Sequence, residues 1–199
     1  MRRTLDTLYR LSGYISACFL AAICFTVAAQ VALNLIDKLA SWITGAAIGL
    51  TIPSYSDFTG FFLAAASFLA LAYTIREGGH IRVTLILQAL SQRVRRIFEF
   101  WSAGLAAAIS IYMTVYTARL VHDSYKFGDV SSGIIAVPIW IPQSTTAIGL
   151  AILSIALIDT LYGLLRGQPA PYEGKGENLL AQTELTPTDE QHTAKPGVE

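Results

Sequence analysis

Four long apolar stretches dominate this sequence and restrict the folds open to it. They cover residues 12–35, 56–75, 98–118 and 144–165. Each is close to the roughly 20 residues that an α-helix needs to cross the hydrocarbon core of a bilayer. A lipid-embedded backbone must also satisfy its hydrogen bonds within the segment. We therefore predict an all-α membrane protein with four transmembrane helices.

The composition agrees with a chain that is surrounded largely by lipid. Hydrophobic residues make up 53% of it and charged residues only 14%, whereas soluble domains are about 25% charged. The last segment, residues 167–199, differs: it is rich in Pro, Glu, Thr and Gly, and Tyr172 is its last aromatic residue. Such a segment buries too little apolar area to order itself. We predict a membrane domain over residues 1–166 and a disordered cytoplasmic tail over 167–199.

Lysine and arginine residues are distributed unevenly among the connecting segments. Three segments hold eleven of them, and these are Arg2, Arg3, Arg10, Arg76, Arg82, Arg93, Arg95, Arg96, Arg166, Lys175 and Lys195. The other two connections hold only Lys38, Arg119 and Lys126. Basic residues gather on the cytoplasmic side of membrane proteins. We therefore expect a multi-pass protein of the cell inner membrane whose N- and C-termini are both cytoplasmic.

The predicted cytoplasmic loop contains an amphipathic pattern. Between residues 83 and 97 apolar side chains recur every three or four positions, while Arg95 and Arg96 lie on the opposite face. This pattern predicts an interfacial helix whose arginines lie at the level of lipid phosphates. The alternative is a helix that packs against a soluble partner.

The two predicted outer loops differ in character. The segment 37–55 is apolar near helical spacing before Pro53, and it could form a short helix along the outer interface. The segment 122–143 contains Gly128, Gly133, Pro138 and Pro142. Because these residues interrupt helices, we predict a non-helical connection over 122–143.

Sequence signatures of enzymes are absent. The chain has no nucleophile elbow, no HExxH pair and no phosphate-binding glycine loop, so we do not expect an enzyme. His80 and His122 are predicted on opposite sides of the membrane, so they cannot share a metal ion or a haem. We expect no metal, no cofactor and no nucleic-acid partner.

Asp159 is the only acidic residue well inside a predicted span. An intramembrane carboxylate suggests an ion or proton role, but pairing with an arginine of the cytoplasmic loop is the interpretation we favour. Gln30 fits an interhelical hydrogen bond better than a substrate contact. Transporters are commonly built around broken helices with a midplane site. Four mostly uninterrupted spans instead indicate an accessory subunit whose partner carries the transport chemistry.

Two motifs resemble those of a known family. Residues 71–83 include the pattern R-x-x-x-H-I-R-V, formed by Arg76, His80, Arg82 and their neighbours. Residues 137–143 include P-x-W-x-P, formed by Pro138, Trp140 and Pro142 and followed by Gln143. In order and spacing, over roughly residues 8–166, the chain resembles the small membrane subunit of tripartite ATP-independent periplasmic (TRAP) transporters. In that family a glutamine often lies late in the first helix, as Gln30 does here.

The resemblance implies a static scaffold subunit without a substrate-binding site of its own. It would pack against a large multispanning membrane subunit within the lipid bilayer and help to dock a periplasmic substrate-binding protein. The complex would import an organic acid, such as a dicarboxylate or sialic acid, together with sodium. The loop 37–55 is longer than is usual for the family. The alternative is a membrane anchor for a redox or other enzyme complex.

The candidate interface and structural residues are those of the two motifs together with polar residues at the ends of the spans. They are Gln30, Asp57, Arg76, His80, Arg82, Arg95, Arg96, Pro138, Trp140, Pro142, Gln143 and Asp159. The sequence itself does not identify the transported substrate.

Overall fold

The computed structural model of this chain describes residues 2–46, 48–77 and 92–166. In this part of the chain the helices are α1 (Arg2–Thr44), α2 (Tyr55–Arg76), α4 (Gln92–Phe127) and α5 (Trp140–Leu165). Each of the four is long and apolar enough to cross a membrane. The predicted all-α membrane fold is confirmed.

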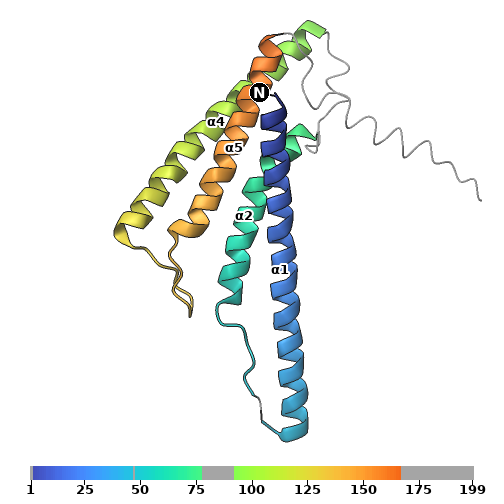
Figure 1. Cartoon of the computed structure of the whole chain (residues 1–199), viewed down its shortest axis with the longest axis vertical. Coiled ribbons are helices and arrows are strands. Elements are labelled where there is room, and N and C mark those ends of the chain that lie inside the picture. The colour runs from blue at the N-terminus through green and yellow to red at the C-terminus, as the bar shows by residue number, and fades with distance from the viewer. Residues whose placement is uncertain (1, 47, 78–91, 167–199) are drawn as a thin grey trace, which may run out of the picture.

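The helices form a layer in the order α4, α5, α2, α1 (Figure 1), and near its start α1 also contacts α5. α5 packs against both α4 and α2, and α1 packs against α2. One end of the layer contains the start of α1 and the ends of α2 and α5, and we call it the Arg76 end. At the opposite end, the Tyr55 end, α2 and α5 begin and α4 ends. α2 and α5 therefore run in the same direction.

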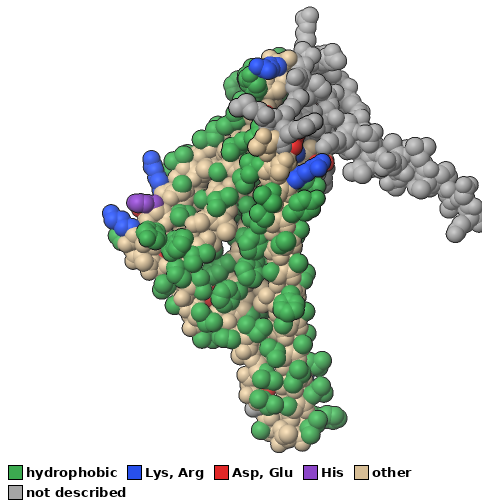
Figure 2. All heavy atoms as spheres, viewed as in Figure 1, with side chains coloured by type: hydrophobic (Ala, Val, Ile, Leu, Met, Phe, Trp, Pro, Cys, Tyr) green, Lys and Arg blue, Asp and Glu red, His purple; other side chains and the backbone are tan. Residues whose placement is uncertain are grey.

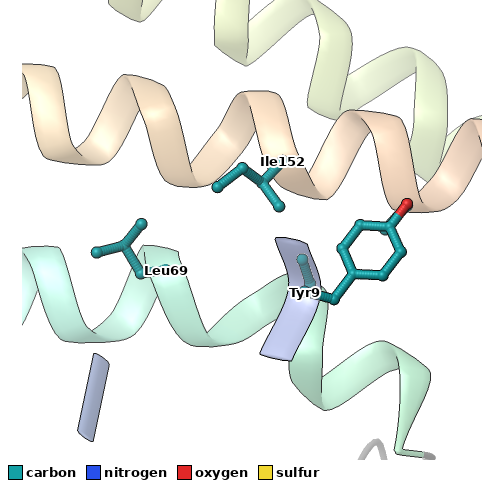
Figure 3. Close-up of a cluster of buried hydrophobic side chains, with 5 residues drawn as sticks. Tyr9, Leu69 and Ile152 are labelled. Atoms are coloured by element: carbon teal, nitrogen blue, oxygen red, sulfur yellow. The ribbon is translucent and has the colours of Figure 1, made fainter. Parts of the chain in front are cut away.

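Small residues allow the neighbouring helices to approach closely. Ala72 of α2 and Ala156 of α5 are completely buried, and they pack with Tyr9, Leu69 and Ile152 in the core where three helices meet (Figure 3). In membranes, close packing of small residues replaces the hydrophobic effect as a main source of helix association.

Hydroxyl groups supply further contacts between helices. Ser110 of α4 shares a hydrogen bond of 2.8 Å with Ser154 of α5, and Thr114 shares one of 3.1 Å with the same hydroxyl. Ser16 of α1 donates to the backbone oxygen of Ala66 on α2 at 2.7 Å. Buried hydroxyls that find a partner across a helix interface stabilise the packing rather than weaken it.

Aromatic residues lie at both ends of the layer. At the Tyr55 end, the rings of Tyr125 and Trp140 make an edge-to-face contact with centroids 5.6 Å apart. At the Arg76 end, Arg166 lies over the ring of Tyr162 at 4.4 Å, and Trp101 is exposed nearby on α4. Tyrosine and tryptophan favour the two membrane interfaces. The 22 residues of α2 span about 33 Å at 1.5 Å per residue, which matches a hydrocarbon core of about 30 Å.

Helix α1 continues well beyond the stretch 12–35 that its uncharged residues indicated. It runs without a break to Thr44, and Gly45 follows with a φ of 76°. The sequence left open whether 37–55 forms a short helix, and the described residues show no separate helix there. Residues 37–44 continue α1, and the described residues from 48 to 54 are not helical.

The connection 122–143 was predicted to be non-helical, and this is correct only for its centre. Residues 122–127 belong to α4, and residues 140–143 begin α5. Gly128, with a φ of 67°, ends α4. Pro142 lies in the first turn of α5, where its missing N–H group has no intrahelical acceptor to lose. The prolines and glycines thus mark the ends of helices rather than the absence of helix throughout.

The predicted interfacial helix lies partly outside the described residues. Nothing is described for residues 83–91, whereas residues 92–97 form the first turns of α4 and are continuous with its apolar part.

Candidate structural joints and partner-contact surfaces

Arg76, the last residue of α2, connects three helices. One of its terminal nitrogens lies 2.9 Å from a carboxylate oxygen of Asp159 on α5 and 2.9 Å from one of Asp6 on α1. The side chain of Arg76 is only 13% exposed and that of Asp159 24%, while Asp6 is more open at 54%. A guanidinium with delocalised charge and several donors suits such a site better than lysine would.

Tyr9 completes this cluster from α1. Its ring lies under the guanidinium of Arg76, with 4.9 Å between the guanidinium carbon and the ring centroid. Figure 3 shows the ring at the edge of the core formed with Leu69 and Ile152. A desolvated cation over an aromatic face is attracted by the quadrupole of the ring. We call Asp6, Tyr9, Arg76 and Asp159 the Arg76 cluster.

The Arg76 cluster indicates a structural role for Asp159. Of the two sequence interpretations, the structure shows the pairing with an arginine, Arg76, next to the loop that was predicted to be cytoplasmic. Breaking such a buried pair leaves an uncompensated charge at considerable cost, so the cluster fixes the ends of α1, α2 and α5 relative to one another. Asp6 was not among the predicted site residues, because it precedes the first apolar stretch and belongs to neither of the two motifs.

A second joint lies at the Tyr55 end. Ser54 precedes α2 with a left-handed φ of 56°, and its hydroxyl accepts a hydrogen bond of 2.9 Å from the backbone N–H of Ile135. Asp57, in the first turn of α2, lies directly against Gly133, where any β-carbon would collide with the carboxylate. An acidic residue in this turn also complements the helix dipole. We call Ser54, Asp57, Gly133 and Ile135 the Ser54 joint.

The loop 128–139 is held in shape by its own hydrogen bonds. The N–H of Ser131 donates to the carbonyl of Val137 at 2.8 Å, and the N–H of Ile139 donates to that of Asp129 at 3.0 Å. Val130 and Pro138 form an isolated β-bridge within it. The loop therefore presents a fixed backbone to α2, and the Ser54 joint ties α5 to α2 at the end opposite Arg76.

The motif around Pro138 forms the entry to α5. Trp140 is the first residue of that helix and contacts Tyr125, while Pro142 and Gln143 lie in its first turn. The side-chain oxygen of Gln143 is buried without a hydrogen-bond partner among the described residues. The motif thus joins the ends of α4 and α5.

Gln30 lies near the Tyr55 end of α1 and is almost completely buried. It accepts a hydrogen bond of 2.8 Å from the N–H of Ile52 and donates to Thr51 at 3.2 Å. About two turns further along α1, Asp37 accepts hydrogen bonds of 2.7 Å from the N–H groups of Ile48 and Gly49. The chain after α1 thus returns along the helix, and we call residues 30–52 the α1 hairpin.

The α1 hairpin extends beyond the other helices. Figure 1 shows the end of α1 far past the start of α2. From Gln30 to Thr44 the helix rises about 21 Å. Hydrophobic side chains cover this projection (Figure 2), and the exposed ones include Leu35, Leu39, Trp42, Ile43 and Ile48. The hydrogen bonds of Gln30 to Thr51 and Ile52 therefore support this projection. The expected hydrogen bond between Gln30 and another helix is not found in the contacts described.

The remaining predicted site residues are placed only in part. His80 and Arg82 lie outside the described residues, and for Arg95 and Arg96 the structure gives only their position in the first turns of α4. Among the described residues no group of His, Cys, Asp and Glu could hold a metal ion. Arg76 and Asp159 meet, whereas Gln30, Asp57 and the Pro138 motif lie at or beyond the opposite end.

Comparison with known proteins identifies the family. The family model described as "Tripartite ATP-independent periplasmic transporters, DctQ component" matches residues 43–167, more than half of the chain, and the match includes all of α2, α4 and α5. A comparison with curated proteins gave no match. The family consists of the small membrane subunits of these transporters. This chain therefore belongs to the DctQ family, the small subunits of TRAP transporters.

Proposed function

We propose that this chain is the fixed scaffold subunit of a sodium-coupled TRAP transporter that imports an organic acid, such as a dicarboxylate or sialic acid. In this proposal a large membrane subunit moves the substrate and sodium, and a periplasmic binding protein delivers the substrate. The proposal rests on the family and on one observation above all. The Arg76 cluster and the Ser54 joint connect α2 to α5 at opposite ends of the layer.

Two joints on the same pair of helices favour a fixed support over a moving part. A single contact leaves a hinge, but contacts about one bilayer thickness apart oppose both sliding and rotation. The polar groups between them also face one another: Ser110, Thr114 and Ser154 are engaged in hydrogen bonds between α4 and α5. Polar side chains inside a membrane commonly mark a path for substrate, and here they serve helix packing.

The proposed orientation places the Arg76 end in the cytoplasm. The described basic residues of the N-terminal segment, of the end of α2 and of the start of α4 lie at this end, as does Arg166. The excess of cationic residues in short loops sets orientation. The loop 128–139 and the α1 hairpin would then face the periplasm, where the binding protein docks.

Cysteine labelling tests the orientation. Cys18 and Cys24 are exposed on α1, so both are first replaced by serine. A membrane-impermeant maleimide applied to intact cells should then label a cysteine at Ser131, and one at Gln92 should be labelled only after the membrane is opened. The reverse pattern refutes the proposed orientation.

The scaffold role is tested by locking two helices together in the transporter complex. Ser110→Cys and Ser154→Cys replace two hydroxyls whose oxygens lie 2.8 Å apart, and oxidation should join α4 to α5. Substrate uptake should be unchanged after oxidation if these helices do not move during transport. Loss of uptake that dithiothreitol restores contradicts a fixed scaffold. The unsubstituted chain must also co-purify with a larger membrane protein.

A further inference from the structure

One face of α4 is left uncovered by the rest of the chain. Ala103, Ala107 and Ser110 on the opposite face are buried against α5. On the uncovered face, Tyr112 and Tyr116 are 56% and 55% exposed, with ring centroids 4.7 Å apart. Their spacing of four residues places them one above the other on a helix. The same face continues with exposed aliphatic residues, namely Leu105, Ile109 and Leu120.

The depth of these two tyrosines follows from their neighbours. Ser110 and Thr114, which flank Tyr112 along α4, both bond to Ser154, and Ser154 lies near the middle of the 26-residue α5. Tyr116 is one turn further along, about 6 Å. Both rings are thus well inside the membrane.

One other tyrosine of the described residues, Tyr14 on α1, lies at a comparable depth, because Ser16, two residues further along, bonds to Ala66 at the middle of α2. The remaining ones lie toward one end of the layer or the other, and they are Tyr9, Tyr73 and Tyr162 at the Arg76 end and Tyr55 and Tyr125 at the Tyr55 end. Those ends are where tyrosine is favoured, because the ring is apolar and the hydroxyl reaches the headgroups. Tyr112 and Tyr116 depart from that distribution.

The hydroxyl groups explain why lipid is a poor cover for this face. Neither hydroxyl makes a hydrogen bond with any residue that the structure describes. Hydrocarbon offers no acceptor, and the headgroups are about 15 Å from the midplane, beyond the reach of a tyrosine side chain. A hydroxyl without a partner in an apolar medium carries a desolvation cost. A protein helix with an acceptor at this depth removes that cost.

We propose that this face of α4, from Leu105 to Leu120, is the contact surface for a transmembrane helix of the large membrane subunit. That helix presents hydrogen-bond acceptors, such as backbone carbonyls freed at a helix break or hydroxyl or amide side chains, to Tyr112 and Tyr116. The inference rests on the proposed function, and it assigns the face by which the scaffold holds its partner.

Photo-crosslinking in the intact complex tests the occupant of this face. Benzoylphenylalanine retains an aromatic ring in place of Tyr112 or Tyr116, and irradiation in membranes should give an adduct with the mass of this chain plus the large subunit. Adducts with lipid alone, or between two copies of this chain, overturn the inference while the complex itself still forms. A chain that purifies without any larger membrane protein instead overturns the proposed function, and this inference with it.

A second measurement tests the hydroxyl groups themselves. Tyr112→Phe and Tyr116→Phe together keep both rings and remove only the oxygens, so the fold of the chain should be unaffected. Association with the large subunit should weaken by roughly three- to thirtyfold, the range expected for two hydrogen bonds within a membrane. Tyr162→Phe, on an exposed ring at the Arg76 end, is the matched control and should leave association unchanged. Unchanged association in the double variant overturns the inference.

Discussion

Arg76 of α2 and Asp159 of α5 form an ion pair of 2.9 Å between two helices that run in the same direction. The two helices also approach at Gly149, whose α-carbon faces the backbone of Phe68. At the opposite end, the hydroxyl of Ser54 holds the loop that leads into α5. Three contacts of different chemistry therefore fix the same pair of helices along their whole length. This pair is the rigid centre of the layer, with α1 and α4 on either side.

Replacing Arg76 with methionine should destabilise the chain strongly. The substitution keeps much of the apolar stem but leaves Asp159 and Asp6 facing each other without a cation. Breaking a buried pair in this way costs about 3–5 kcal/mol, and exposure of Asp6 places the expected loss at the lower end. The melting temperature of the detergent-purified chain measures it.

The double variant Arg76→Met with Asp159→Leu separates charge from packing. Because neutral replacement of a whole buried pair is often tolerated, it should recover a large part of the lost stability. Asp6→Asn, at the more open carboxylate, should cost much less than Asp159→Asn. Equal losses for the two asparagine variants would contradict the assignment of Asp159 as the principal partner.

Gly149→Ala should weaken the contact between α2 and α5. A β-carbon on Gly149 would lie 2.6 Å from the carbonyl carbon of Phe68, so a backbone must move. Overpacking of this kind costs about 1–3 kcal/mol. Gly163→Ala is the matched control, because it lies on the same helix and its β-carbon would meet no atom within 4 Å. The control should be neutral or slightly stabilising, and equal effects on the melting temperature would argue against the close approach.

Gly133→Ala should detach the loop 128–139 from α2. The new β-carbon would collide with the carboxylate of Asp57, and the hydrogen bond between Ser54 and Ile135 should be lost with it. Asp57→Ala removes the nearer of the two obstacles, the other being the hydroxyl oxygen of Ser54 at 2.8 Å. The double variant should therefore be more stable than the sum of the two single effects predicts. A double-mutant cycle on melting temperature measures this coupling, and strict additivity would show that the two residues do not meet.

For the part of the chain that the structure describes, the sequence was sufficient to predict the four membrane-spanning helices, because hydropathy and length determine which segments can cross a bilayer. The ends of those helices were less predictable. The first apolar stretch ends near Leu35 because Asp37 and Lys38 follow, yet no glycine or proline interrupts the chain between Gly13 and Gly45. Charged residues mark the membrane surface, whereas glycine marks the end of the helix, and in α1 these two positions differ.

The contacts between helices were also predictable only in part. The ion pair between Asp159 and an arginine could be predicted from the sequence, because a carboxylate inside a span and near a basic loop requires a cation. Neither the role of Asp6 nor the close contact between Asp57 and Gly133 could be predicted. Each depends on segments 70 or more residues apart in the chain, and no local periodicity records which helices become neighbours.

Gln30→Leu should release the non-helical segment 48–54, which returns along α1 in the α1 hairpin. Gln30 accepts the N–H of Ile52 and donates to Thr51, so leucine removes both bonds and leaves that N–H open to exchange. Deuterium uptake in the segment 48–54 should rise, as measured by exchange with mass spectrometry, while uptake in α2 stays the same. Asn34→Ala is the control, because in the contacts described Asn34 bonds to Gln30 but not to the segment 48–54. If the control raises uptake in this segment as much as Gln30→Leu does, then helix packing rather than the Gln30 side chain holds the hairpin closed.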